Sequence, residues 1–249
     1  MENGYQFNGL AFITDGGPVA IAVAVILLVM SVASWYLIII KSYQLISLRK
    51  ASAGYSQGFW QASSIEAALK EANADTPLAR IALQSVEAAE HHQRHAAQRL
   101  GDVCNQDEFI ARAMRRVIGQ ESAKLESGLT VLASVGSVAP FVGLFGTVWG
   151  IYHALASISM SGQATLDKVA GPVGEALIMT ALGLAVAIPA VLAYNALVRS
   201  NRVLLGQIEN FAHDLHTFLT TGAPLVSSET QKETAAAKTV PAHLKEVPA

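Results

Sequence analysis

Three long runs without any Asp, Glu, Lys or Arg constrain what this 249-residue chain can fold into. They occupy residues 16–40, 127–166 and 176–198. Each run meets or exceeds the roughly 20 residues that a helix needs to cross about 30 Å of hydrocarbon. The middle run has room for one span and a loop, but not for two full spans. The sequence therefore predicts an all-α membrane protein with three transmembrane helices. The predicted spans are residues 17–40, 129–155 and 171–198.

Composition excludes several other classes of protein. The formal net charge is -2, so no overall basic character indicates a nucleic-acid partner. The single cysteine, Cys104, excludes an internal disulfide framework and a metal site built on several thiolates. No Lys or Arg precedes the first apolar run, and that run is too long for a signal peptide. The first helix is therefore expected to remain in the mature protein.

The distribution of Lys and Arg predicts the orientation of the three spans. Residues 1–16 contain none, residues 41–128 contain eleven, and the chain from Arg199 onward contains five. Only Lys168 lies between the second and third spans. Because Lys and Arg collect on the cytoplasmic side, the N-terminus is expected outside and the C-terminus inside. The segments outside the spans are then a periplasmic N-terminal segment (1–16), a cytoplasmic helical domain (41–128), a periplasmic loop (156–170), a cytoplasmic helix (199–221) and a disordered tail (222–249).

Residues 41–128 have mostly helical patterns. Thr76 followed by Pro77 is typical of a helix start, with a capping side chain before a proline at the first helical position. A later helix, from about Asp107 to Glu126, is expected to run straight into the second span. Long helices would thus project from the membrane into the cytoplasm.

The second and third spans each carry a stripe of small residues at spacings of 4, 3, 4 and 3. The second-span stripe comprises Gly136, Pro140, Gly143, Thr147 and Gly150; the third-span stripe comprises Ala176, Thr180, Gly183, Ala187 and Ala190. Small faces let helix backbones approach closely in lipid, where packing rather than hydrophobicity drives association. The threonine in each stripe has two interpretations. It bonds to a carbonyl one turn earlier and fills space, or its hydroxyl lines a polar path between helices.

Glu175 stands at the head of the third span, and it also has two interpretations. If the helix starts with Pro172 at its first helical position, Glu175 is an ordinary acid near the first turn, favoured by the helix dipole. If the helix begins earlier, near Thr165, Glu175 is carried into the membrane, where an ionisable group normally marks an ion or proton path. By helical geometry it flanks the stripe, about 100° round from Ala176.

Other charged and ionisable side chains suggest weaker sites. A basic cluster is expected to enforce topology and meet anionic lipid, with binding of partner tails as the alternative; it comprises Arg112, Arg115, Arg116 and Lys124. Two histidine pairs could in principle hold a divalent ion, but no carboxylate or cysteine completes either at metal-site spacing; they are His91 with His95, and His213 with His216. We therefore expect no metal and no cofactor. No nucleophile or phosphate-loop motif predicts an enzyme.

Two long motifs closely resemble the TolQ/ExbB/MotA family of bacterial inner-membrane motor proteins. They are PFVGLFGTVWGI (140–151) and GPVGEALIMTALGLAVAIPAVLAYN (171–195). Three spans match the ExbB and TolQ branches over most of the chain, whereas the MotA branch has four. The phrase SVAPFVGLFGTVWGI is more similar to ExbB than to TolQ, which stays as the alternative.

The resemblance implies a function and a set of partners. It implies a ring, thought to be five subunits, around single-span ExbD-like helices, each carrying a membrane aspartate that this chain lacks. Such a complex uses the proton motive force, and TonB transmits the energy to outer-membrane uptake of iron-siderophores, vitamin B12 and similar cargo. The family's pore threonines fall on Thr147 and Thr180, and its third-helix glutamate on Glu175. A TolQ-like role in the Tol-Pal envelope system and a non-conducting scaffold role remain the alternatives.

Overall fold

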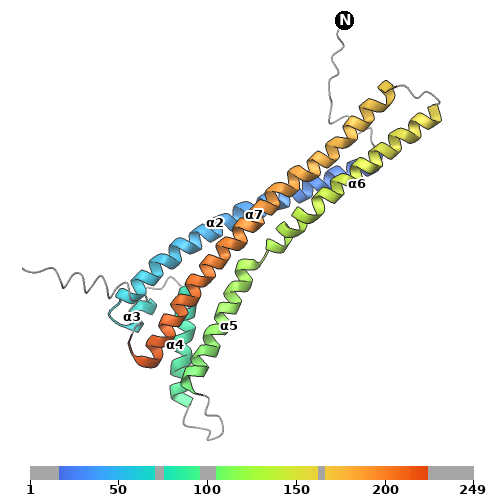
Figure 1. The fold of residues 1–249 in the computed structure, drawn as a ribbon. Coiled ribbons are helices and arrows are strands. Elements are labelled where there is room, and N and C mark those ends of the chain that lie inside the picture. The colour runs from blue at the N-terminus through green and yellow to red at the C-terminus, as the bar shows by residue number, and fades with distance from the viewer. Residues whose placement is uncertain (1–16, 71–75, 96–104, 162–165, 224–249) are drawn as a thin grey trace, which may run out of the picture. The chain divides into compact units, whose positions relative to one another are not determined.

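We analysed a computed structural model, which describes residues 17–70, 76–95, 105–161 and 166–223. Six helices and no strand occur in these ranges: α2 (Gly17–Gln61), α3 (Ile65–Lys70), α4 (Pro77–His95), α5 (Gln106–Glu126), α6 (Leu129–Ser161) and α7 (Leu166–Thr221) (Figure 1). Three stretches, within α2, α5–α6 and α7, are long and apolar enough to cross a membrane. The prediction of an all-α protein with three such helices is confirmed.

The chain divides into two compact units. The first comprises Met1–Lys50 and Ser122–Leu204, and the second comprises Ala51–Glu121 and Leu205–Ala249. The first unit holds the apolar part of α2, all of α6, and most of α7. The second holds α3, α4, most of α5 and the ends of α2 and α7.

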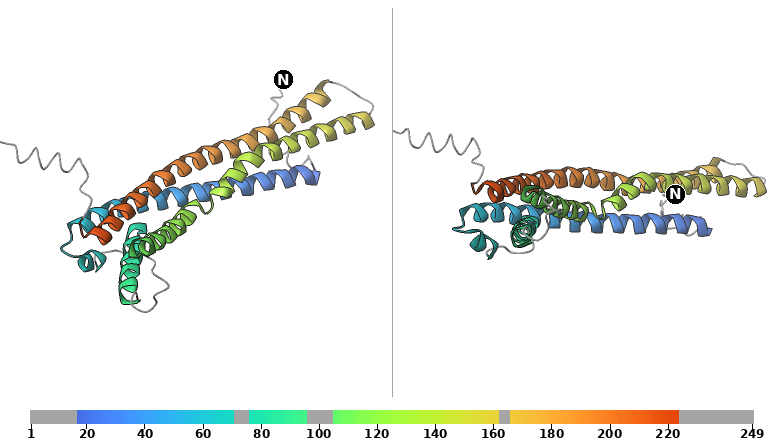
Figure 2. Two further views of the ribbon diagram at one scale, coloured as in Figure 1. Left: turned by 60° about the horizontal axis from the view of Figure 1, so that its bottom comes forward. Right: turned by 90° about the horizontal axis from the view of Figure 1, so that it is seen from below.

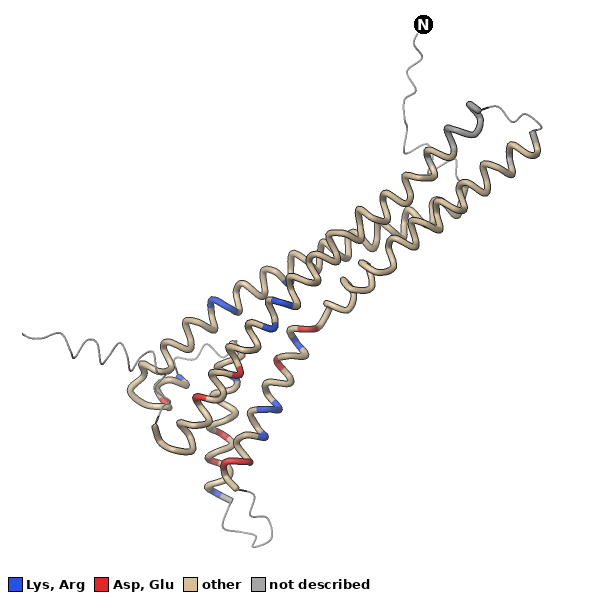
Figure 3. The backbone as a smooth tube through the Cα atoms, in the orientation of Figure 1, with Lys and Arg blue, Asp and Glu red and all other residues tan. Residues whose placement is uncertain are grey.

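Besides the apolar part of α2, the first unit holds α6 and most of α7, which lie side by side (Figure 2). Their facing side chains are fully buried at Leu132, Ala139, Met179 and Ala190. No charged residue interrupts α6 along its length (Figure 3). Because its outward residues are also large and apolar, this unit has the composition of a membrane-embedded bundle.

Helix α2 packs against the others through a narrow face only. Ala20, Val23 and Leu27 are buried, whereas the aromatic pair Trp35 and Tyr36 is exposed. An aliphatic helix with most of its surface exposed is suited to lipid contact, and aromatic side chains near the end of a span are typical interfacial anchors.

The second unit has a core of its own. Helix α4 starts at Pro77, and the Thr76 hydroxyl caps it by accepting the Ala79 amide at 3.2 Å. The buried Glu121 of α5 forms a two-pronged ion pair with Arg80 of α4, with Arg80 Nε 2.9 Å from Oε1 and a terminal nitrogen 2.5 Å from Oε2. An aromatic cluster joins the ends of α2 and α7 in this unit; it comprises Tyr55, Phe59, Trp60, Phe211 and Phe218.

One expectation about the helices was wrong. The helix ending at Glu126 does not run straight into the second span, because the chain leaves helical geometry at Ser127 and Gly128 before α6 begins at Leu129. Gly128 has a φ of 81°, a left-handed conformation that a right-handed helix cannot contain. The second span is therefore a separate helix.

Candidate functional site

The α6–α7 seam is built around two glycines in backbone contact. A Cβ placed on Gly183 would lie 2.7 Å from the Ala139 carbonyl oxygen and 3.1 Å from the Gly143 Cα. A Cβ placed on Gly143 would lie 2.5 Å from the Met179 carbonyl oxygen. Real Cβ atoms do not approach backbone atoms so closely, so this crossing needs glycine on both helices.

Most of the two predicted stripes lies in this seam. In α6, Gly136 and Thr147 are buried along with Gly143, while Pro140 and Gly150 are partly exposed. In α7 the buried members are Ala176, Gly183, Ala187 and Ala190, and Thr180 is partly exposed. A Cβ on Gly136 would overlap the Val191 side chain. The structure thus brings the two stripes together over several turns.

One glycine of the seam is absent from the predicted stripes. Gly146 is buried, and a Cβ there would lie 2.9 Å from Val23 Cγ1 of α2 and 3.2 Å from Met179 Cβ of α7. At this residue α6 lies close to both α2 and α7. Its spacing of three residues from Gly143 was the available signal, because residues three apart share a helix face.

The two stripe threonines meet across the seam. Their hydroxyl oxygens lie 2.5 Å apart, and Thr147 is only 5% exposed. Thr147 Oγ1 is also 3.1 Å from the Ala176 carbonyl oxygen and 3.2 Å from the Gly143 carbonyl oxygen. Thr147 therefore makes both kinds of contact considered from its sequence, one to its own preceding turn and one across to α7.

The number of protons available decides which threonine donates in the hydrogen bond between Thr147 and Thr180. A carbonyl only accepts, and each hydroxyl has one proton to donate. When Thr147 donates its one proton to a carbonyl, that of Ala176 or that of Gly143, Thr180 must be the donor in the bond between the threonines. The two hydroxyl groups therefore form a hydrogen bond with Thr180 as donor and Thr147 as acceptor, inside an otherwise apolar seam.

Helix α7 starts early enough to carry Glu175 well past its first turn. Its first residue is Leu166, which makes Pro172 an interior residue rather than the helix start. Glu175 is the tenth residue of the helix, about 14 Å along the axis at 1.5 Å per residue. It directly precedes Ala176, whose carbonyl accepts the Thr147 hydroxyl. The side chain of Glu175 lies outside the described residues.

The four residues of the basic cluster are exposed side chains of α5. Arg112 pairs with Glu108 one turn earlier on α5 at 2.5 Å, and Arg115 and Arg116 are exposed on the same helix. Lys124 is exposed near the α5 end.

Two of the four histidines have side-chain contacts other than metal ligation. His216 Nε2 lies 3.1 Å from an Asp107 carboxylate oxygen, and His91 stacks on Phe109 with ring centroids 6.0 Å apart. The side chain of His95 lies outside the described residues. Among those described, no group of three His, Cys, Asp or Glu could hold a metal ion.

Similarity to known proteins covers most of the chain. The family model described as "MotA/TolQ/ExbB proton channel family" matches residues 73–210. "Biopolymer transport protein ExbB" of Xanthomonas campestris is 47% identical over 206 residues, covering 81% of this chain and 81% of that protein. The ExbB of Neisseria meningitidis is 42% identical, covering 82% and 94%. "Tol-Pal system protein TolQ" of Pseudomonas aeruginosa is 35% identical, covering 84% and 91%.

Each of these relatives is matched over most of its own length. Identity to the ExbB proteins, at 42–47%, exceeds the 35% found for that TolQ. The chain belongs to the MotA/TolQ/ExbB proton channel family, and within it is more similar to these ExbB proteins than to that TolQ.

Proposed function

We propose that this chain is an ExbB-like subunit of an inner-membrane motor that uses the proton motive force to energise TonB-dependent uptake through the outer membrane. The cargo of such uptake would be iron-siderophores, vitamin B12 and similar compounds. The observation that carries the proposal is the hydroxyl pair of Thr147 and Thr180, buried in the seam of a chain 47% identical to an ExbB. The protein is proposed to be a transport component rather than an enzyme.

The proton path is proposed to include Glu175, Thr147 and Thr180. A hydroxyl can accept one proton while donating another, which is what a relay station requires. A carboxylate carried into a span is costly unless it serves such a path. Each proton crossing 100 mV supplies about 2.3 kcal/mol, so a motor stroke would use several protons.

Orientation is proposed from charge, and location from the family. The excess of Lys and Arg in residues 41–128 and after Arg199 supports an N-outside, C-inside arrangement, and membership of the family supports the bacterial inner membrane. The proposed cytoplasmic segments, 41–128 and 199–221, would then lie on the inner side. The basic residues Arg112, Arg115, Arg116 and Lys124 would lie on that side, near anionic lipid headgroups.

Partners are proposed from the exposed apolar surface and from the family to which the chain belongs. Large apolar side chains are exposed on α6 and α7, with Phe141 at 70% and Leu192 at 64%, which leaves surface for lipid and for further copies of the chain. We propose a homo-oligomer, with five subunits as the expected number, around an ExbD-like single-span partner with a membrane aspartate. Since α6 contains no carboxylate, such a partner would contribute an acid facing the threonines. TonB would act downstream.

Complementation tests this proposal. The full chain is expressed in a strain lacking ExbB and in one lacking TolQ. The first strain is scored for growth on a siderophore as the iron source, and the second for resistance to detergent. We expect restored siderophore growth, which Glu175→Ala, Glu175→Gln and Thr147→Val abolish. Ser137→Ala is the matched control, because the Ser137 hydroxyl bonds back to Ala133 of its own helix at 3.0 Å and is exposed.

The outcomes separate the alternatives. Rescue of the TolQ-deficient strain alone would assign the Tol-Pal role. If the Glu175 and Thr147 variants assemble with ExbD and support full siderophore growth, the chain is a non-conducting scaffold and the proton path is wrong.

A further inference from the structure

The break between α5 and α6 leaves backbone carbonyls that a continuous helix would have satisfied. The last four carbonyls of any helix lack partners within it. Here the chain turns through Ser127 and Gly128, so the carbonyls of Lys124 and Leu125 must find donors elsewhere.

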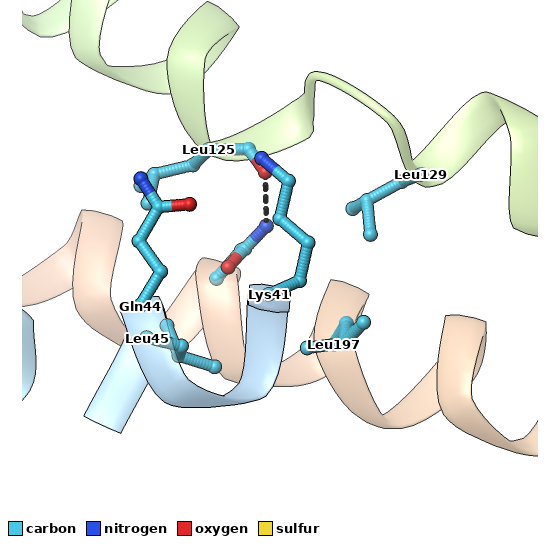
Figure 4. A pocket seen from close by; sticks show the side chains of 7 residues that line it. Lys41, Gln44, Leu45, Leu125, Leu129 and Leu197 are labelled. Carbon is cyan, nitrogen blue, oxygen red and sulfur yellow. Dashed lines mark hydrogen bonds between the residues drawn. The ribbon is translucent and has the colours of Figure 1, made fainter. Parts of the chain in front are cut away.

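Side chains from the other two helices supply those donors, and Figure 4 marks the hydrogen bond to the Leu125 carbonyl with a dashed line. Asn201 of α7 donates its amide Nδ2 to the Leu125 carbonyl at 2.9 Å. Lys41 of α2 lies 3.4 Å from the Lys124 carbonyl oxygen and 3.1 Å from Ser127 Oγ. The Ser127 hydroxyl itself donates to the Lys124 carbonyl oxygen at 2.9 Å. The end of α5 is therefore held from both α2 and α7 at one small pocket, which Gln44 also lines.

The Asn201 bond belongs to the same helix register as the threonine pair. Four contacts between α7 and the α5–α6 segment define this register. They join Thr180 to Thr147, Gly183 to Gly143, Val191 to Gly136 and Asn201 to Leu125. From the first pair to the last, the residue number on the α5–α6 side falls by 22 and the residue number on α7 rises by 21. The antiparallel register thus continues past the break with a drift of one residue.

We propose that Asn201 and Lys41 are positioning residues for the Thr147–Thr180 pair. By holding the end of α5, they fix where α6 starts and how α6 lies against α7. A slip of one helical turn moves Thr147 by about 5.4 Å along the seam, and such a slip breaks the bond at Asn201 together with the bond between the threonines. This inference rests on the proposed proton path for its functional consequence, but its structural claim stands on the contacts alone.

A disulfide reporter tests the register in the full chain, expressed in membranes. The background carries Cys104→Ser. In-register cysteines are Gly136→Cys with Val191→Cys, since a Cβ at residue 136 would lie 3.6 Å from the Val191 Cα, compatible with disulfide geometry. Off-register cysteines are Gly136→Cys with Asn195→Cys, one turn further along α7, combined with Val191→Ala because a Cβ at residue 136 would overlap the Val191 side chain. The measurement is the ratio of in-register to off-register cross-linking.

Matched variants separate positioning from a general loss of stability. Asn201→Leu removes the amide at similar size, and Lys41→Met keeps the stem but removes the charge. We expect each to lower the ratio about fivefold, the effect of one hydrogen bond, and to lower siderophore uptake in parallel. Lys41→Arg keeps a cationic donor and should restore the ratio. Gln44→Leu, the same chemical change in the same pocket, should leave the ratio unchanged.

The outcomes are decisive in both directions. An unchanged ratio in Asn201→Leu overturns the inference; if that variant does not accumulate, Lys41→Met decides in the same way. A lowered ratio with full uptake overturns the link to the proton path. The proposed function fails separately, when Thr147→Val and Glu175→Gln keep full uptake with the register intact.

Discussion

Replacing Gly183 by alanine should force α6 and α7 apart. The new Cβ would lie 2.7 Å from the Ala139 carbonyl oxygen and 3.1 Å from the Gly143 Cα, and both are backbone atoms. Neither contact can be relieved by turning a side chain. Reaching an ordinary contact near 3.4 Å requires the helices to separate locally by about 0.7 Å.

The cost follows from that separation. Overpacking a tight contact costs about 1–3 kcal/mol, while alanine gains about 1 kcal/mol over glycine in helix propensity. The same movement would stretch the bond between Thr147 and Thr180 from 2.5 Å to about 3.2 Å, past the usual range for hydroxyl pairs. An interhelical hydrogen bond in a membrane contributes about 0.6 kcal/mol. The net loss in unfolding free energy should be about 1–2 kcal/mol.

Gly206 provides a matched control on the same helix. A Cβ there meets nothing within 4 Å, so Gly206→Ala should stabilise the protein by up to about 1 kcal/mol. Both variants are unfolded from mild detergent micelles with SDS and followed by far-ultraviolet circular dichroism. The two unfolding free energies should differ by about 2–3 kcal/mol. If Gly183→Ala is as stable as Gly206→Ala, the backbone contact at the seam does not exist as described.

The same unfolding assay checks three further predictions. Arg80→Met removes the guanidinium that pairs with the buried Glu121 carboxylate and should cost about 3 kcal/mol, whereas Arg80→Met with Glu121→Leu should regain most of it; equal losses in both would contradict this. The more exposed pair of His216 and Asp107 should show a coupling below about 1 kcal/mol in a double-mutant cycle, and a larger value would refute that estimate. Gly128→Ala should cost about 1–2 kcal/mol because of its φ of 81°, and Gly128→Asn less; a neutral Gly128→Ala would mean that the turn is not left-handed.

Much of the membrane-embedded unit was predictable from sequence because lipid imposes simple rules. Runs without charge predicted three apolar helices, and spacing alone predicted the faces on which Gly143 and Gly183 meet. The helix start at Pro77 was also signalled locally, by the capping Thr76. Each of these features depends on residues within about one helix turn of each other, or on whether a segment lies in lipid or in water.

What escaped prediction depends on partners distant in sequence. The break at Gly128 was missed because glycine occurs inside helices as well, and only its backbone conformation distinguishes the two cases. Asn201 and Lys41 look like ordinary polar residues at the end of a span, and their role depends on carbonyls about 80 residues away. Hydropathy marks where the lipid ends rather than where a helix ends, so it did not show that α2 continues beyond its predicted span to Gln61, or that the helix predicted for residues 199–221 is one continuous helix with the third span.

Proton flux tests the central claim most directly. The full chain is co-expressed with an ExbD-like partner, reconstituted into vesicles with an imposed potential, and followed with a pH-sensitive dye. The account predicts proton uptake that Glu175→Gln abolishes and Thr147→Val strongly reduces, while Ser137→Ala matches the unmodified chain. Undiminished flux through the Glu175→Gln and Thr147→Val complexes would contradict it.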